Sequence, residues 1–350
     1  MAVTDPTVTG NATKAIGGWL RSLEELVSTP PEHRGDSVPW AEALRILRCP
    51  ESILQELVDR GLQCDERDGD RFVERADLYN VALRSGSGRS LPELGAVFIR
   101  RLRREGVVAW TQRRQWDVRL ELRCPLGSDC GVGPWALARP VPSALGGSDG
   151  RWQIGDDEAP PTGSITAPSS KQFFAVKGSF ATQGAVADVL SRAAQDAYAA
   201  TVDNYRYQVL SLTWAEDLDS LRSARVADCV GIANILAEAC RELGYDADVD
   251  SGLLLGTFGF SRHRWVRVLD DDGRWKILEP TLPLMSRLGR DQDPEADAEF
   301  TRFCCGSSLN RIVACEALDS GELAEHFCHG HHRRPEIAIR AHAKADRTRD

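Results

Sequence analysis

The first hundred residues carry apolar positions at helical spacing. Apolar side chains between Trp19 and Val27 predict a short helix. Two further helices are expected on either side of Pro50, and Gly61 is placed to end the second of them. A turn, the short strand R-F-V, the helix A-D-L-Y-N-V-A-L and a helix over residues 91–104 follow. This part of the chain is therefore predicted to be mainly helical.

From Val107 the spacing of apolar residues changes from the helical period to the period of two that is typical of strands. The segments W-D-V-R-L-E-L-R-C, P-W-A-L-A-R-P-V-P and F-F-A-V-K-G-S-F predict three strands. Residues 143–170, rich in Gly, Pro, Ser and Asp, predict a long surface loop. Helical spacing resumes over residues 185–202, whereas the chain after Pro294 is weakly patterned. The middle of the chain is therefore predicted to be rich in strands.

The clearest pattern lies within residues 226–284. A helix is expected to begin at Cys229, with Asp228 as its N-cap and Gly244 after its end. A strand, a glycine-containing loop over 256–262, and the two strands H-R-W-V-R-V-L and R-W-K-I-L follow in that order. A helix followed by an antiparallel hairpin predicts an α+β fold for this segment.

The changes of pattern divide the chain into five predicted parts. They are a helical extension (1–36), a small helical domain (37–106), a β-rich domain (107–182), an α+β catalytic domain (183–295) and a tail that contains cysteine and histidine (296–350). The role of the small helical domain is left open by the sequence.

Composition and charge exclude several classes of function. With 43 Lys and Arg against 52 Asp and Glu, the net charge of −9 argues against nucleic-acid binding through bulk charge. The start M-A-V-T-D-P-T-V-T-G lacks the features of a signal peptide, and no apolar run is long enough to span a bilayer. We therefore expect a cytoplasmic protein without a membrane role, whose ten cysteines are reduced.

Cys229 is the candidate nucleophile. At the start of a helix its thiol meets the positive end of the helix dipole and several backbone N–H groups, both of which favour the thiolate. The small residues Gly231 and Ala233 are expected to leave room for a substrate carbonyl. The alternative is a buried structural cysteine, the interpretation that suits Cys240 on the same helix.

His263 and Glu279 follow Cys229 in the order expected of a base and its orienting carboxylate. Their contact depends on the turn between two strands. A three-residue loop over 271–273, with Gly273 left-handed, pairs Trp265 with Glu279 and places the carboxylate one diagonal step from the imidazole. A two-residue turn would place Glu279 on the opposite face.

The motifs D-C-V-G-I-A-N-I-L-A-E-A-C-R-E-L-G-Y, H-R-W-V-R-V and W-K-I-L-E-P-T, in this order, resemble the transglutaminase-like superfamily within the papain-like group. The resemblance covers about 185–284, and the W-A-L-A-R-P-V-P stretch resembles the β layer that precedes this core in bacterial members. It implies a cysteine-bearing helix packed on an antiparallel sheet. Cys229 would be the nucleophile and His263 its general base and acid. Glu279 stands where the family usually has aspartate.

The resemblance implies acyl transfer. A thiolate attacks an amide or thioester, backbone donors bind the oxyanion, and water or an amine resolves the acyl-enzyme. Gln208 and Trp214 are candidates for the family's upstream oxyanion helper. The expected substrate is a peptide, a protein or a carrier-bound acyl group, and amide formation in natural-product biosynthesis is among the family's activities. The alternative is a fold with a degraded triad that serves as a protein- or peptide-binding module.

Residues 38–83 resemble helix-turn-helix domains of the excisionase and MerR type. Glu51, Glu56 and Asp59 on the would-be recognition helix disfavour DNA binding, so a DNA-binding regulator is the weakest hypothesis. The arginines within 100–104 are interpreted as a solvated face or an interdomain contact.

The remaining cysteines and histidines suggest metal binding only weakly. Cys124 and Cys130 flank a predicted turn and could pair or bind metal, although such thiols are more often incidental. The tail motif H-F-C-H-G-H-H has ligand types suited to zinc, but its spacing fits no standard pair. The alternative for the tail is a helix with buried cysteines and a solvated histidine-rich turn. We therefore expect neither a metal nor a cofactor.

Overall fold

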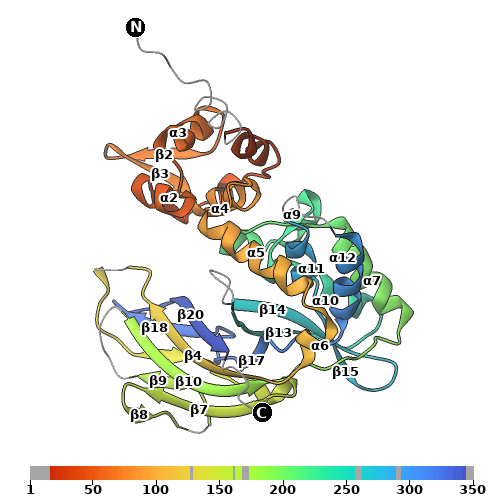
Figure 1. Ribbon diagram of the computed structural model, residues 1–350. Coiled ribbons are helices and arrows are strands. Elements are labelled where there is room, and N and C mark those ends of the chain that lie inside the picture. Colours follow the sequence, from red (N-terminus) through yellow and green to blue (C-terminus); the bar gives the residue numbers. More distant parts are fainter. Residues whose placement is uncertain are drawn as a thin grey trace, which may run out of the picture. The chain divides into compact units, whose positions relative to one another are not determined.

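Two units, each assembled from segments distant in the sequence, make up the chain. One comprises residues 1–103, 199–236 and 280–298, and the other comprises 104–198, 237–279 and 299–350. The computed structural model describes residues 16–126, 129–160, 162–167, 173–256, 262–288 and 293–343. Helices and antiparallel sheets are mixed, so the predicted α+β class is confirmed (Figure 1). No helix in these ranges is both long and apolar enough to cross a bilayer.

The first unit is mainly helical, and its N-terminal part has the predicted elements. Residues 16–24 are helical. Next come β1 (Ser37–Pro39), α2 (Trp40–Leu47), α3 (Glu51–Asp59), β2 (Cys64–Arg67), β3 (Asp70–Glu74) and α4 (Arg75–Arg84). The three strands form a small antiparallel sheet in the order β1-β3-β2, and one apolar core joins it to the helices. Pro50 caps α3 and Gly61 is left-handed, as expected. Residues 1–15 of the predicted extension lie outside the described ranges.

The basic run on α5 (Leu91–Arg103) belongs partly to the interior of this unit. Arg103 is 1% exposed and pairs with Asp297 at 2.8 Å. Arg100 donates to the carbonyl of Leu288 at 2.7 Å. The interpretation as a solvated face is therefore wrong for Arg103, whereas the contacts of Arg100 and Arg103 with residues after 280 fit the alternative of a contact between predicted domains. A buried arginine needs charged or carbonyl partners, and Arg103 has them in Asp297 and the Ser286 carbonyl.

The rest of the first unit consists of short elements. They are β11 (Arg206–Tyr207), α8 (Leu212–Ala215), α9 (Leu218–Ala224), β12 (Val226–Ala227) and α11 (Thr281–Ser286). Strands β11 and β12 pair in parallel, and β12 leads directly into α10 (Cys229–Glu242). The predicted end of α10 is confirmed, since Gly244 is left-handed at φ 90° and the Tyr245 N–H returns to the Cys240 carbonyl.

The second unit contains three antiparallel sheets. A six-stranded sheet has the order β16-β15-β14-β13-β17-β6, a five-stranded sheet β20-β4-β10-β7-β8, and a four-stranded sheet β19-β18-β5-β9 (Figure 1). The bounds are α6 (Gly106–Thr111), β4 (Arg114–Arg123), β5 (Trp135–Leu137), β6 (Arg139–Pro140), β7 (Ser148–Ile154), β8 (Asp157–Glu158), β9 (Ile165–Ala167), β10 (Phe173–Thr182), β13 (Ala247–Leu254), β14 (Arg262–Leu269), β15 (Trp275–Leu278), β16 (Cys305–Gly306), β17 (Ile312–Glu316), β18 (Ala324–Cys328), β19 (His331–Arg333) and β20 (Glu336–Ala343). One apolar core contains residues from all three sheets.

Three sequence predictions for this unit are wrong. Residues 143–170 contain strands β7, β8 and β9, because long-range pairing with β10 and β5 overrides a turn-rich composition. The tail begins within helix α12 (Pro294–Phe303), but its segment H-F-C-H-G-H-H forms β18 and β19 in place of a helix. Helix α7 (Arg192–Asn204) starts later than expected, because the buried Asp270 carboxylate binds the N–H groups of Leu190 and Ser191 just before it.

Candidate active site

His263 and Glu279 form a buried pair. The His263 Nε2 atom lies 2.7 Å from Glu279 Oε2, and the two residues are 3% and 1% exposed. A carboxylate at this distance accepts the Nε2 proton and fixes the tautomer, so Nδ1 is the nitrogen left to exchange a proton. Gly252 lies opposite His263 on β13, where a Cβ would come within 2.0 Å of the Val313 carbonyl oxygen. The backbone around the imidazole is therefore closely packed.

Of the two registers that the sequence allows for these strands, the structure has the one that belongs to a three-residue loop. Val266 pairs with Leu278 and Arg267 with Ile277, and one further step in this register places Trp265 opposite Glu279. The loop has three residues, since Asp270 N–H donates to the Arg274 carbonyl, and Gly273 is left-handed at φ 72°. Turn chemistry thus places the carboxylate on the same face of the sheet as the imidazole.

The backbone of Glu279 is held on both sides. Its N–H donates to the Cys304 carbonyl at 2.9 Å, and its own carbonyl accepts the Tyr198 hydroxyl at 3.1 Å. Burial, followed by the nearby Glu279 carboxylate, raises the pKa of the Cys304 thiol well above its usual value. Cys304 therefore stays a neutral thiol beside the carboxylate.

Cys229 occupies the first position of α10, in the other unit. The Asp228 carboxylate caps the helix by accepting the N–H groups of Val230 at 2.9 Å and Gly231 at 3.0 Å. No described residue accepts the N–H of Cys229 itself. The Cys229 thiol is half-buried. Burial is the main cause that raises the pKa of the nearby Tyr207 hydroxyl well above its usual value, and the charges of Cys229 and Asp228 raise it further. This helix end therefore offers one backbone donor beside a thiol.

The sequence from β10 to the end of β15 matches a known family. Residues 179–280 match the sequence model of the Transglutaminase-like superfamily. This part of the chain is a transglutaminase-like domain. It contains Cys229, His263 and Glu279, so all three residues named from the motifs fall within the matched region.

The chain was also compared with solved structures and with curated protein sequences. The chain is similar to a solved structure from Cytophaga hutchinsonii that is named a candidate cysteine protease, with 13% identity and a TM-score of 0.42 over 68% of this chain and 93% of that one. A comparison with curated protein sequences gives no match.

The candidate oxyanion helpers of the transglutaminase-like domain are engaged elsewhere. The Gln208 amide accepts the Val27 N–H at 3.3 Å and donates to the Val27 carbonyl at 2.6 Å. The Trp214 indole N–H donates to Ser220 Oγ at 2.9 Å. Both residues are buried, and these bonds give them structural roles. The Cys229 N–H is the better candidate for an oxyanion donor.

Gly231 has a packing role in the transglutaminase-like domain. A Cβ there would lie 2.4 Å from Leu221 Cδ1, so the buried Leu221 side chain would have to move to make room for it. Ala233 is fully buried. The expectation that these two small residues leave room for a substrate is therefore wrong, because their faces contact the interior of the unit.

Capping of α10 by Asp228 gives a first prediction. Asp228→Ala removes the acceptor of two N–H groups, so we expect the free energy of unfolding to fall by about 1 kcal/mol. Asp228→Asn retains a capping oxygen and is the matched control, expected to lose less than about half of that. Chemical denaturation of the two variants measures the difference. Equal losses would mean that the capping bonds do not stabilise the helix.

Several other cysteines have raised thiol pKa values, which lower the fraction of reactive thiolate. Burial raises the pKa of Cys49 and of Cys240 to about 11, and that of Cys305 to about 12. The structural interpretation of Cys240 fits its complete burial. Cys64, half-buried on β2, serves as a reference cysteine outside the proposed site.

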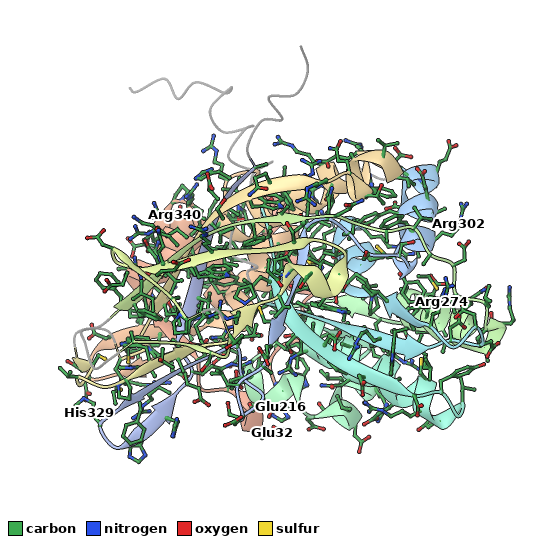
Figure 2. All side chains as sticks on the ribbon, turned by 90° about the horizontal axis from the view of Figure 1, so that it is seen from below. Glu32, Glu216, Arg274, Arg302, His329 and Arg340 are labelled. Carbon is green, nitrogen blue, oxygen red and sulfur yellow. The ribbon has the colours of Figure 1, made fainter. Side chains whose placement is uncertain are left out.

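A groove of about 640 Å³ lies on the open face of the five-stranded sheet. Its lining includes Arg119, Arg151, Lys177 and the exposed Arg340, which is labelled in Figure 2. None of the three predicted site residues lines it. The groove is therefore separate from the predicted site residues.

Proposed function

We propose that the transglutaminase-like domain catalyses acyl transfer through Cys229, His263 and Glu279. The observation that carries this proposal is the buried contact of 2.7 Å between His263 Nε2 and Glu279 Oε2. Burial of a charged carboxylate–imidazole pair costs free energy. Such buried pairs are often found where a carboxylate orients a catalytic imidazole. Glutamate in place of the usual aspartate reaches the imidazole here.

Each residue has one role in the proposed reaction. His263 Nδ1 takes the proton of the Cys229 thiol, and the thiolate attacks the carbonyl carbon of an amide or thioester. The Cys229 N–H donates to the oxyanion, and the imidazolium returns its proton to the leaving amine or thiol. Water or an amine, deprotonated by His263, then attacks the acyl-enzyme and releases Cys229. The substrate is a peptide, a protein or an acyl group on a carrier.

Selective alkylation tests this proposal. At pH 6 an ordinary thiol is almost entirely protonated, so we expect iodoacetamide to label Cys229 at least about tenfold faster than Cys64. Mass spectrometry of peptides gives both rates in one sample. His263→Ala is expected to bring the rate at Cys229 close to that at Cys64, because the partner that takes the thiol proton is lost.

Two controls accompany the alkylation. His342→Ala removes an exposed imidazole on β20 and should leave the rate at Cys229 unchanged. Cys229→Ala should abolish the fast phase while Cys64 still reacts. If Cys229 is no faster than Cys64, or if His263→Ala has no effect, the catalytic proposal fails and the fold serves as a binding module.

A further inference from the structure

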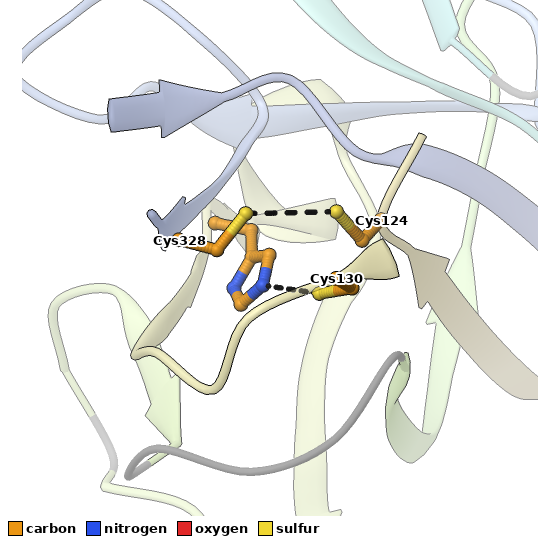
Figure 3. Close-up of side chains that lie close together, drawn as sticks. Cys124, Cys130 and Cys328 are labelled. Atoms are coloured by element: carbon orange, nitrogen blue, oxygen red, sulfur yellow. Dashed lines mark hydrogen bonds between the residues drawn. The ribbon is translucent and has the colours of Figure 1, made fainter. Parts of the chain in front are cut away.

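Three cysteines and one histidine converge in the second unit, outside the transglutaminase-like domain. Cys124 follows β4, Cys130 precedes β5, and His326 and Cys328 belong to β18. One ligand atom from each residue lies within 4.8 Å of each of the others. Figure 3 shows the thiols of Cys124, Cys130 and Cys328 turned toward one another. We call these four residues the Cys₃His cluster.

The distances within the Cys₃His cluster suit a tetrahedral metal. At the tetrahedral angle, zinc–sulfur bonds of about 2.3 Å and zinc–nitrogen bonds of about 2.0 Å give S···S edges of about 3.8 Å and S···N edges of about 3.5 Å. The Cys124 and Cys328 Sγ atoms are 3.8 Å apart, and Cys130 Sγ lies 3.1 Å from His326 Nε2. The first edge matches and the second is slightly shorter. A disulfide needs sulfur atoms about 2 Å apart, which these are not.

The histidine of the cluster is oriented as a metal ligand. His326 Nδ1 lies 3.1 Å from the Pro134 carbonyl oxygen, which holds the proton on Nδ1 and directs the lone pair of Nε2 toward the thiols. The ring is fully buried and stacks on Trp135, with ring centroids 3.7 Å apart. A carbonyl-bound, buried imidazole whose other nitrogen faces sulfur is the usual arrangement at a zinc ion.

Strand β18 contributes two of the four residues of the Cys₃His cluster. His326 and Cys328 are two residues apart on β18, so their side chains share one face, and both are buried while Phe327 between them is exposed. The other half comes from the segment after β4. Gly133 lets this segment approach β18, because a Cβ there would lie 1.5 Å from the Phe327 carbonyl oxygen.

We propose that Cys124, Cys130, His326 and Cys328 bind one zinc ion in a structural site. Three thiolates and one imidazole are the ligand set of closed zinc sites, and four protein ligands leave no position for a substrate. Binding requires the three thiols to release their protons to solvent. The ion would join the segment between β4 and β5 to the hairpin of β18 and β19, about two hundred residues later in the sequence.

Metal analysis of the full-length protein tests the site. Protein purified without chelators should contain about one zinc per chain by inductively coupled plasma mass spectrometry. Cys130→Ser and Cys328→Ser should each reduce the content at least about tenfold. Cys315→Ser is the matched control: its thiol packs against the same apolar core but lies outside the cluster, so zinc should be retained.

A spectroscopic readout keeps the test valid if a variant folds poorly. Wild-type protein freed of metal and titrated with Co²⁺ should develop sulfur-to-cobalt charge transfer and the visible bands of tetrahedral cobalt, saturating at about one equivalent. Zinc should then displace the cobalt. The proposal is overturned if wild-type protein neither contains zinc nor gives this spectrum. Full zinc content in Cys130→Ser, iron in place of zinc, or a Cys124–Cys328 disulfide in the native protein would also overturn it.

Discussion

Replacing Glu279 by glutamine is expected to slow the reaction of Cys229 with iodoacetamide at pH 6 by about 100-fold or more. The carboxylate accepts the Nε2 proton of His263 across 2.7 Å. A glutamine amide can instead donate to Nε2, which moves the ring proton to Nδ1, where it blocks proton transfer from the thiol. The negative charge that stabilises the imidazolium is lost as well.

Two variants make this result interpretable. Glu279→Asp keeps the charge and is expected to stay within about tenfold of wild type, as the aspartate usual in the family suggests. Glu316→Gln removes a carboxylate exposed on β17 and should have no effect. Thermal unfolding should be nearly the same for Glu279→Gln, because the side chains have almost equal shape. A rate within threefold of wild type would remove Glu279 from the proposed triad.

Removal of zinc is expected to lower the thermal midpoint of unfolding by about 10 °C or more. Joining two segments about two hundred residues apart stabilises a fold by about 3–5 kcal/mol through the unfolded state alone, and the metal–ligand bonds add to this. Differential scanning calorimetry with and without a strong chelator measures the shift. This prediction rests on the proposed metal site.

The matched sample for calorimetry is Cys328→Ser. It should already have the lower midpoint, and the chelator should not lower it further. A chelator effect of equal size in Cys328→Ser would place the stabilising metal elsewhere. Alkylation of Cys229 below the unfolding transition should be insensitive to the chelator, which separates this result from the catalytic proposal.

The sequence was most informative where the determining chemistry is local. The sequence around Asp271, Asp272 and Gly273 reduces the hairpin to two possible turns, and the choice between them decides on which face Glu279 lies. The start of α10 at Cys229 and its end before Gly244 follow from capping residues next to them. The helix could thus be predicted, and the hairpin narrowed to two turns, without knowledge of any distant contact.

Features that depend on distant partners could not be predicted. The sequence presents Cys124 and Cys130 in one place and H-F-C in another, and only the pairing of β18 with β5 brings them together. The tail was weakly patterned in the sequence, because β18 to β20 obtain their stability from pairing with strands elsewhere in the chain. Gly231 has the same sequence signature whether it leaves space for a ligand or for Leu221.

The pairing of β20 with β4 has a consequence for the order of folding. Glu336–Ala343 aligns with residues 116–123 along eight positions, so the five-stranded sheet gains this strand only after more than two hundred further residues have been synthesised. Pairing over such separations is slow because the intervening chain must first be ordered. During synthesis, β4 would therefore present an unpaired edge that needs protection from other chains. The ribosome releases the elements of the transglutaminase-like domain before the neighbouring sheet can be completed.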